Sequence, residues 1–179
     1  IDSAAVIAAG NLAVEGGDSA QTTGVIAFSS IHTWTSQSGD FVINGRVTNE
    51  AATALEAVRI TALLSDASGA KLVEATNVVP LEVLTPGQSA PFSVRFRGGR
   101  PPAAVRYELD AAARDAEYAL GAHLGDSRFI RGNERAFYNA SNLFSVVGDV
   151  VNATDAGAYY VKAVVTVFDE TGNVVAVDS

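Results

Sequence analysis

This sequence predicts an all-β protein made of two copies of one domain, and the prediction rests on three observations. First, residues 142–175 align without a gap with residues 39–72. Second, the apolar residues are mainly Val and Ala, and helix-forming Lys and Glu are sparse. Third, short runs of alternating apolar and polar residues end at Gly, Asn or Asp, as strands end at turns. A repeat offset of about 103 residues indicates a whole domain rather than a solenoid unit.

The repeat keeps residue types that end strands and form turns. The second copy has no counterpart for the residues after Thr76 in the first copy, including the segment 80–96. We therefore expect an N-terminal extension over 1–23, a first sandwich over 24–110, a linker over 111–125 and a second, incomplete sandwich over 126–179. The matched pairs are Gly45 with Gly148, Val47 with Val150, Asn49 with Asn152, Val58 with Val161, Asp66 with Asp169, and Gly69 with Gly172.

The first copy can be divided into strands by its alternation. Residues 41–49 alternate apolar and polar side chains, which predicts one buried face and one wet face. The next strand places Val58, Ile60, Ala62 and Leu64 on one face. Later strands are expected to place Phe92, Val94 and Phe96 on one face, and to cover residues 104–109.

Glycine and proline mark the turns between these strands. Residues 66–69 and 169–172 each form a short polar loop that ends in Gly, which predicts a β-hairpin in each copy. Residues 84–87 end in Pro86 and Gly87, the residues that favour the two central places of a type II turn.

Two segments fall outside the repeated strands. Residues 110–120 are Ala-rich and have helix propensity, so we expect a linker with at most a short helix. Residues 1–23 begin with a Val-Ala stretch and continue as a polar spacer. This segment has the apolar content of a strand but no strand partner of its own in either copy.

Composition and charge exclude several classes of partner. The chain has 179 residues, a net charge of -8, and only two lysines, Lys71 and Lys162. An acidic surface repels phosphate groups, so neither nucleic acid nor anionic lipid is an expected partner. The apolar segment 4–14 contains Gly10 and Asn11 and is well below the ~20 residues of a spanning helix. We therefore expect no membrane span.

The chain contains neither methionine nor cysteine. We interpret the missing methionine as the loss of an upstream segment, through cleavage of an export signal or because the chain is a fragment of a longer protein; the sequence does not separate the two. The missing cysteines fit an exported prokaryotic protein without disulfides. The expected location is extracellular or at the cell surface.

Taken in order, these motifs resemble the FxLYD domain family. The second copy has Val165-Thr166-Val167-Phe168-Asp169 where the family has its naming motif, and residues 148–152 match an earlier signature. The first copy has the fuller pattern, including residues 84–87 and Phe92, but Ser65 replaces the aromatic residue. The resemblance covers the chain from about residue 25 onward. It implies two immunoglobulin-like β-sandwich domains in tandem, with a structural or accessory role on an exported protein and no catalytic residues.

The sequence predicts no catalytic, cofactor-binding or metal-binding set of residues. The Asp-x-x-Gly loops at Asp66 and Asp169 lack the dense oxygen ligands of an EF-hand and are better explained as hairpin turns. His32 and His123 are isolated from each other and from any cysteine. Ser89 lacks the strand-to-helix context of a nucleophile elbow, so we expect a loop residue.

Three surface features allow two interpretations each. Asn139 and Asn152 are each the first residue of a glycosylation sequon. Asn152 matches Asn49, which is not in a sequon, so we expect the Asn152 side chain to bond its own turn. A glycan on Asn139 remains the open alternative. Trp34, Tyr159 and Tyr160 are aromatic residues that either pack or stack on a sugar. Arg95, Arg97, Arg100 and Arg106 form either a solvated stripe or a contact for an acidic partner.

The incomplete second copy leads to a functional hypothesis. A sandwich without its closing strands exposes an apolar face and unpaired strand edges, which another chain's strand can fill. If the N-terminal segment of the next subunit is that strand, the contact is head-to-tail and yields a filament. The expected donor residues are Val6, Ile7, Leu12 and Val14. The expected acceptor groove contains Val147, Val165, Val167 and Val175.

Three functions remain open from the sequence. The preferred one is a structural subunit of an extracellular filament or surface assembly, formed by strand donation. The second is an adhesive or ligand-binding module of a larger secreted or surface protein, which would use aromatic residues such as Trp34 or Tyr159. The third is a piece of a longer exported protein without an assembly role. An enzyme is the class that the sequence favours least.

Overall fold

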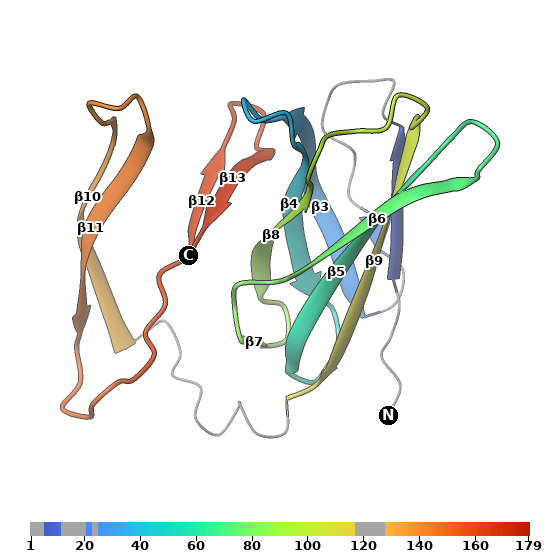
Figure 1. Ribbon diagram of the computed structural model, residues 1–179. Coiled ribbons are helices and arrows are strands. Elements are labelled where there is room, and N and C mark those ends of the chain that lie inside the picture. Colours follow the sequence, from blue (N-terminus) through green and yellow to red (C-terminus); the bar gives the residue numbers. More distant parts are fainter. Residues whose placement is uncertain (1–5, 12–20, 23–24, 117–127) are drawn as a thin grey trace.

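The computed structural model describes residues 6–11, 21–22, 25–116 and 128–179, and these residues form an all-β protein (Figure 1). They contain strands β1 to β13, which belong to four separate sheets. The strands are β1 (Val6–Asn11), β2 (Gln21–Thr22), β3 (Ile26–Thr35), β4 (Phe41–Asn49), β5 (Leu55–Ser65), β6 (Lys71–Val78), β7 (Val83–Leu84), β8 (Ser89–Phe96), β9 (Arg106–Asp115), β10 (Phe129–Tyr138), β11 (Phe144–Asn152), β12 (Val165–Phe168) and β13 (Val174–Asp178).

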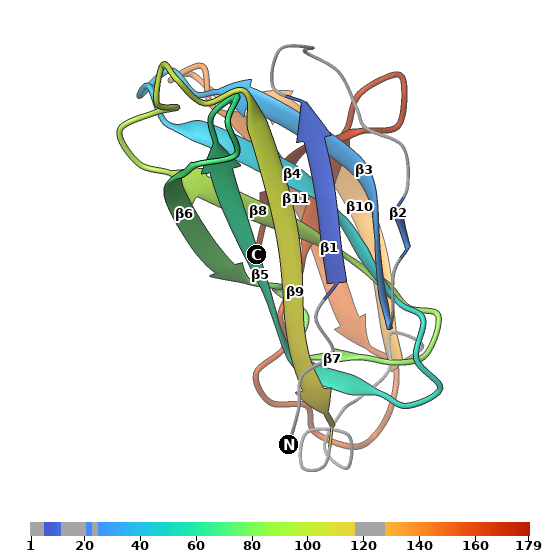
Figure 2. The ribbon, with the colours of Figure 1, turned by 90° about the vertical axis from the view of Figure 1, so that its right-hand side faces the viewer.

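Two of the sheets pack face to face as a β-sandwich. One has the strand order β1-β9-β5-β6, with β7 also paired to β5, and the other has the order β2-β3-β4-β8. All of the pairings are antiparallel. The turned view in Figure 2 shows β1 along the edge of the first sheet, beside β9.

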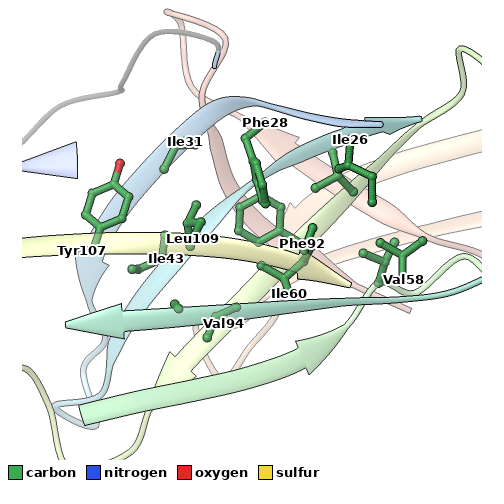
Figure 3. Close-up of a cluster of buried hydrophobic side chains, with 14 of the residues drawn as sticks. Ile26, Phe28, Ile31, Ile43, Val58, Ile60, Phe92, Val94, Tyr107 and Leu109 are labelled. Atoms are coloured by element: carbon green, nitrogen blue, oxygen red, sulfur yellow. The ribbon is translucent and has the colours of Figure 1, made fainter. Parts of the chain in front are cut away.

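The core lies between these two sheets and is built by alternation. Phe92 meets Phe28 edge to face, with ring centroids 5.7 Å apart. Ile43, Ile60 and Leu109 are fully buried in the same cluster (Figure 3). The expected inward faces of β5 and β8 are confirmed by their burial: Val58, Ile60, Ala62, Leu64, Phe92, Val94 and Phe96.

The predicted turns of the first copy are confirmed. Gly87 has φ +74° and the N–H of Gln88 donates to the carbonyl of Thr85, as a type II turn with Pro86 and Gly87 at its centre requires. Gly69 has φ +85° and its N–H donates to the carbonyl of Asp66 in the β5–β6 hairpin.

The segments outside the repeat behave differently from expectation. The part of residues 110–120 that the structure describes is not helical, since β9 continues to Asp115 and pairs with Leu55 of β5. The antiparallel pairing of β9 along β5 therefore outweighs the helix propensity of the alanine residues in this segment. The sequence offers no strand partner for the N-terminal extension, yet β1 pairs with β9, Val6 opposite Ala111, and β2 pairs with β3.

The second copy forms two separate two-stranded sheets, β10–β11 and β12–β13. Figure 1 shows the β10–β11 hairpin standing apart from the sandwich, with β12–β13 between them. Most side chains of β10 and β11 are exposed.

The outer face of β4 is not wet, which corrects the sequence prediction. Val42 is 1% exposed and Asn44 is equally buried, although both point away from the sandwich core. The cover comes from β13, which lies against β3, β4 and β8. Val174 is fully buried, and the Asn44 side-chain amide donates to the carbonyl of Val175 at 2.9 Å. Residues about 130 positions away in sequence thus exclude water from this face. The alternation of residues within β4 cannot reveal this contact.

Candidate functional site

The hairpin β10–β11 repeats the geometry of β3–β4 residue for residue. Both hairpins are interrupted by one register shift, between Ser29 and His32 in the first copy and between Gly132 and Arg135 in the second. The outer pairs also correspond at the same offset: Ile26 with Asn49 and Thr35 with Phe41 in β3–β4, and Phe129 with Asn152 and Tyr138 with Phe144 in β10–β11.

The hairpin β12–β13 repeats the part of β5–β6 next to the turn. The register shift between Leu64 and Ser65 recurs between Val167 and Phe168. Non-glycine residues with positive φ recur as well: Ser30 and Asn133 at the bulges, and Ala57 and Tyr160 further along. The sequence repeat is therefore accompanied by a repeat of the register shifts and of the positive-φ positions.

The two Asp turns are held by equivalent hydrogen bonds. The Asp169 carboxylate accepts from the N–H of Asn173 at 2.9 Å and from the hydroxyl of Thr171 at 2.8 Å. The bonds from the Asn173 backbone, first, and the Thr171 hydroxyl lower the pKa of Asp169 to about 2. The Asp66 pKa is also lowered, first by the Ser68 hydroxyl. The carboxylate oxygens thus serve the turns, in agreement with the expected hairpin role.

The second copy differs from the first in what covers it. In the first copy, β8 pairs with the second edge of β4, and β9 pairs with the second edge of β5. Among the described strands, β11 pairs only with β10, and β12 pairs only with β13. Large apolar side chains of the β10–β11 hairpin are also exposed: Ile130, Phe137, Tyr138, Leu143, Phe144, Val146, Val147, Val150 and Val151.

The four expected acceptor residues lie on two different hairpins. Val147 is on β11 and is 49% exposed, whereas Val165 and Val167 on β12 and Val175 on β13 are half-buried. By the repeat, Val147 is the equivalent of Asn44. It therefore lies on the face of β11 that corresponds to the outer face of β4. The residues that match the core-facing side of β4 are Phe144, Val146, Gly148 and Val150.

The expected donor residues are only partly described. Val6 and Ile7 lie in β1, opposite Ala111 and Asp110 of β9. Leu12 and Val14 lie outside the described residues. In the single chain, β1 is an edge strand of its own sandwich, so donation to a neighbour requires that β1 exchange one partner for another.

The asparagines of the sequons both bond their own turns. The Asn152 side chain accepts from the N–H of Thr154 and donates to the carbonyl of Ala156, which repeats the bonds of Asn49 and confirms the expected turn role. The Asn139 oxygen accepts from the N–H groups of Ser141 and Leu143. Its amide nitrogen, the atom that a glycan would modify, is 3.4 Å from the Ser145 hydroxyl.

The remaining candidates do not gather into one site. Trp34 lies on β3 and is 36% exposed, whereas Tyr159 and Tyr160 protrude from the loop before β12. His32 is half-buried in β3, and His123 lies outside the described residues. Ser89 is not in a loop but begins β8, where its hydroxyl bonds that of Thr48.

The arginine stripe is partly engaged within the first sandwich. Arg95 forms an ion pair with Asp40 at 3.5 Å, and the Arg100 guanidinium lies 6.0 Å from the centre of the Phe41 ring. A hollow of about 600 Å³ is lined by residues 52–54 and by Asp115, among others. The Asp115 carboxylate accepts a hydrogen bond from the Thr53 hydroxyl.

No helix in the described part of the chain has the length and apolar character to cross a membrane. No protein-family model, no curated protein and no solved structure matches the chain. The geometry of the second copy is therefore the main guide to function.

Proposed function

We propose that this protein is a non-catalytic structural subunit of an extracellular filament or cell-surface assembly, in which strands of neighbouring chains complete the second copy. In this proposal both copies are immunoglobulin-like sandwiches of the FxLYD type, in tandem. The observation that supports it most is the contrast between copies. The edges that β8 and β9 cover in the first copy are unpaired on β11 and β12 in the described structure.

Strands of other chains should bind here because unpaired strand edges and exposed apolar faces are unfavourable in water. An unpaired strand edge presents a row of backbone donors and acceptors to any strand that approaches it. Isolated two-stranded hairpins are marginally stable at best. The exposed apolar side chains of β10 and β11 add a hydrophobic gain when a strand covers them.

The N-terminal segment is the proposed donor. As an edge strand, β1 is paired only with β9 in the described structure, so its release breaks a single ladder. Exchange of such a strand between identical chains is a low-cost route to assembly, and a head-to-tail contact of this kind does not close on itself. The proposed acceptor is the free edge of β12, beside Val165 and Val167.

A disulfide lock tests the donor role. Ala9 faces Glu108 across the β1–β9 ladder, Glu108 is exposed, and the chain contains no cysteine. The double variant Ala9→Cys/Glu108→Cys should hold β1 on its own sandwich when oxidised, because paired antiparallel residues lie within disulfide range. We expect no polymers from the oxidised chain by electron microscopy, and polymers after reduction.

The two single-cysteine variants, each capped with a thiol-blocking reagent, are the matched controls and should polymerise under both conditions. Polymers from the fully oxidised double variant would exclude β1 as the donor.

The alternative function is an adhesive or ligand-binding module, which the exposed Trp34 and Tyr159 favour. Loss of carbohydrate or protein binding in Trp34→Ala or Tyr159→Ala would support that alternative.

A further inference from the structure

The strand β11 contains the same tripeptide as β8. Phe92-Ser93-Val94 lies in β8, and Phe144-Ser145-Val146 lies in β11. In the first copy, β8 is the strand that covers the second edge of β4. β11 is the repeat equivalent of β4, so its second edge corresponds to the edge of β4 that pairs with β8. The same strand also contains the tripeptide with which β8 pairs to β4.

The first copy shows how the tripeptide fits. Phe92 lies opposite Gly45, Ser93 opposite Asn44 and Val94 opposite Ile43. The Phe92 ring occupies the space over Gly45, because a Cβ atom at Gly45 would lie 2.6 Å from the ring. Glycine at this position therefore admits an aromatic side chain from the neighbouring strand.

The second copy has the same recess without a ring in it. Gly148 is the repeat equivalent of Gly45, and Val147 and Val146 are equivalent to Asn44 and Ile43. The three atoms nearest to a Cβ atom at Gly148 would all belong to the opposite strand of its own hairpin, with the Glu134 Cγ nearest at 3.3 Å. Phe144 and Val146 on the same face are 46% and 38% exposed.

We propose that β11 of a second copy of this chain fills this recess and joins two molecules through an antiparallel β11–β11 pair. When the β8 register is transferred, Phe144 of one chain faces Gly148 of the other, Ser145 faces Val147, and Val146 faces Val146. This register is unchanged by rotation about a two-fold axis at Val146. Each chain therefore gives one Phe144 ring and receives one, as an isologous interface requires.

Two other registers, centred on Asp149 and on Gly148, are less favourable. Centring the pair on Asp149 places two carboxylates opposite each other, and like charges opposite each other destabilise a sheet. Centring it on Gly148 places two glycines together and leaves Phe144 opposite Asn152. The register centred on Val146 opposes no like charges, because Leu143 then faces Asp149, and it fills both recesses.

The size of the contact predicts a weak dimer. Stable interfaces bury about 800 Å² per partner. In this register only residues 144–148 of the nine-residue β11 face β11 of the other chain, so the contact is expected to be smaller. The dimer should therefore be concentration-dependent. This dimer rests on the proposed function in one respect, namely that neighbouring chains complete the second copy. It uses the edge of β11 and leaves the edge of β12 free for the donor strand.

A single cysteine at the two-fold axis tests the register. In Val146→Cys the two thiols oppose each other directly, so oxidation should link the chains into a covalent dimer. Val150→Cys is the matched control on the same strand and face; its thiols face Asn142 and should cross-link at least tenfold less. Equal cross-linking of both variants, or none of Val146→Cys, would overturn the proposal.

The recess itself is tested by sedimentation of the full chain. Gly148→Val and Phe144→Ala should each raise the dimer dissociation constant at least tenfold, whereas Gly132→Val on β10, away from the paired edge, should leave it unchanged. A dimer that is insensitive to both substitutions would refute the contact. Deletion of residues 1–14 should abolish polymers but not the Val146→Cys cross-link, so that failure of the donor role and failure of this dimer are separate results.

Discussion

Glycines 45 and 148 show at the scale of single residues how one sequence position has two environments. Neither glycine has a positive φ, so backbone strain does not explain the residue type. At Gly45 the cause is the Phe92 ring, which occupies the place of a side chain. The sequence alone shows that glycine recurs at 148, but the reason for it emerges only from the packing of the first copy.

A matched pair of alanine substitutions measures this difference. Gly45→Ala forces a Cβ atom against the Phe92 ring and should lower the free energy of unfolding by about 1–3 kcal/mol through overpacking. Gly148→Ala meets the flexible Glu134 side chain and should change the free energy by less than about 0.5 kcal/mol. Urea unfolding followed by Trp34 fluorescence, at concentrations where the chain is monomeric, gives both values. Equal effects would refute the packing argument.

Asp169 predicts a specific acid response. Its pKa is lowered from 3.8 to about 2 by hydrogen bonds that only the folded turn provides. A lowered folded pKa means that the stabilisation is present above the unfolded pKa and is lost as the pH falls through the folded value. The β12–β13 hairpin should therefore weaken as the pH falls from near 3.8 toward 2.

Nuclear magnetic resonance of the Asp169 carboxyl carbon checks this response, with an expected titration midpoint near 2. Asp169→Asn keeps an oxygen that accepts the turn bonds but does not titrate, so it should remove this pH dependence of the hairpin. A midpoint near 3.8 in the native chain would contradict the turn geometry.

At the scale of elements, the hairpins could largely be predicted from the sequence. The alternation on β5 and β8 and the turns at 66–69 and 84–87 are confirmed because local chemistry determines them. The repeated bulges could not be predicted, since Ser30 and Asn133 share a positive φ but not a residue type. The strand β9 is longer than its composition suggests, because its partner β5 sets its length.

Docking of the β12–β13 hairpin on the first sandwich is a testable contact between elements. Val174→Asp places a carboxylate at a fully buried position and should undock the hairpin, because a buried unpaired charge is costly. The Asn44 side-chain amide, which bonds the Val175 carbonyl, should then lose its protection from hydrogen exchange. The exposed neighbour Ala176→Asp is the control and should preserve that protection. Unchanged protection in Val174→Asp would contradict the docking.

At the scale of the whole molecule, long-range pairing decides what the sequence leaves open. The partner of β1 is β9, about a hundred residues away, and the cover of Val42 comes from β13. Neither contact leaves a local pattern in the segments involved. The separation of β10–β11 from β12–β13 is equally invisible to the repeat, because the repeat describes each hairpin but not what lies between them.

The central claim is that strands of neighbouring chains complete the second copy. The most direct measurement is the mass of the chain of residues 1–179 in solution, by light scattering over a wide range of concentrations. The account predicts masses that rise with concentration above the 18.5 kDa of one chain. A mass of 18.5 kDa at every concentration would contradict it.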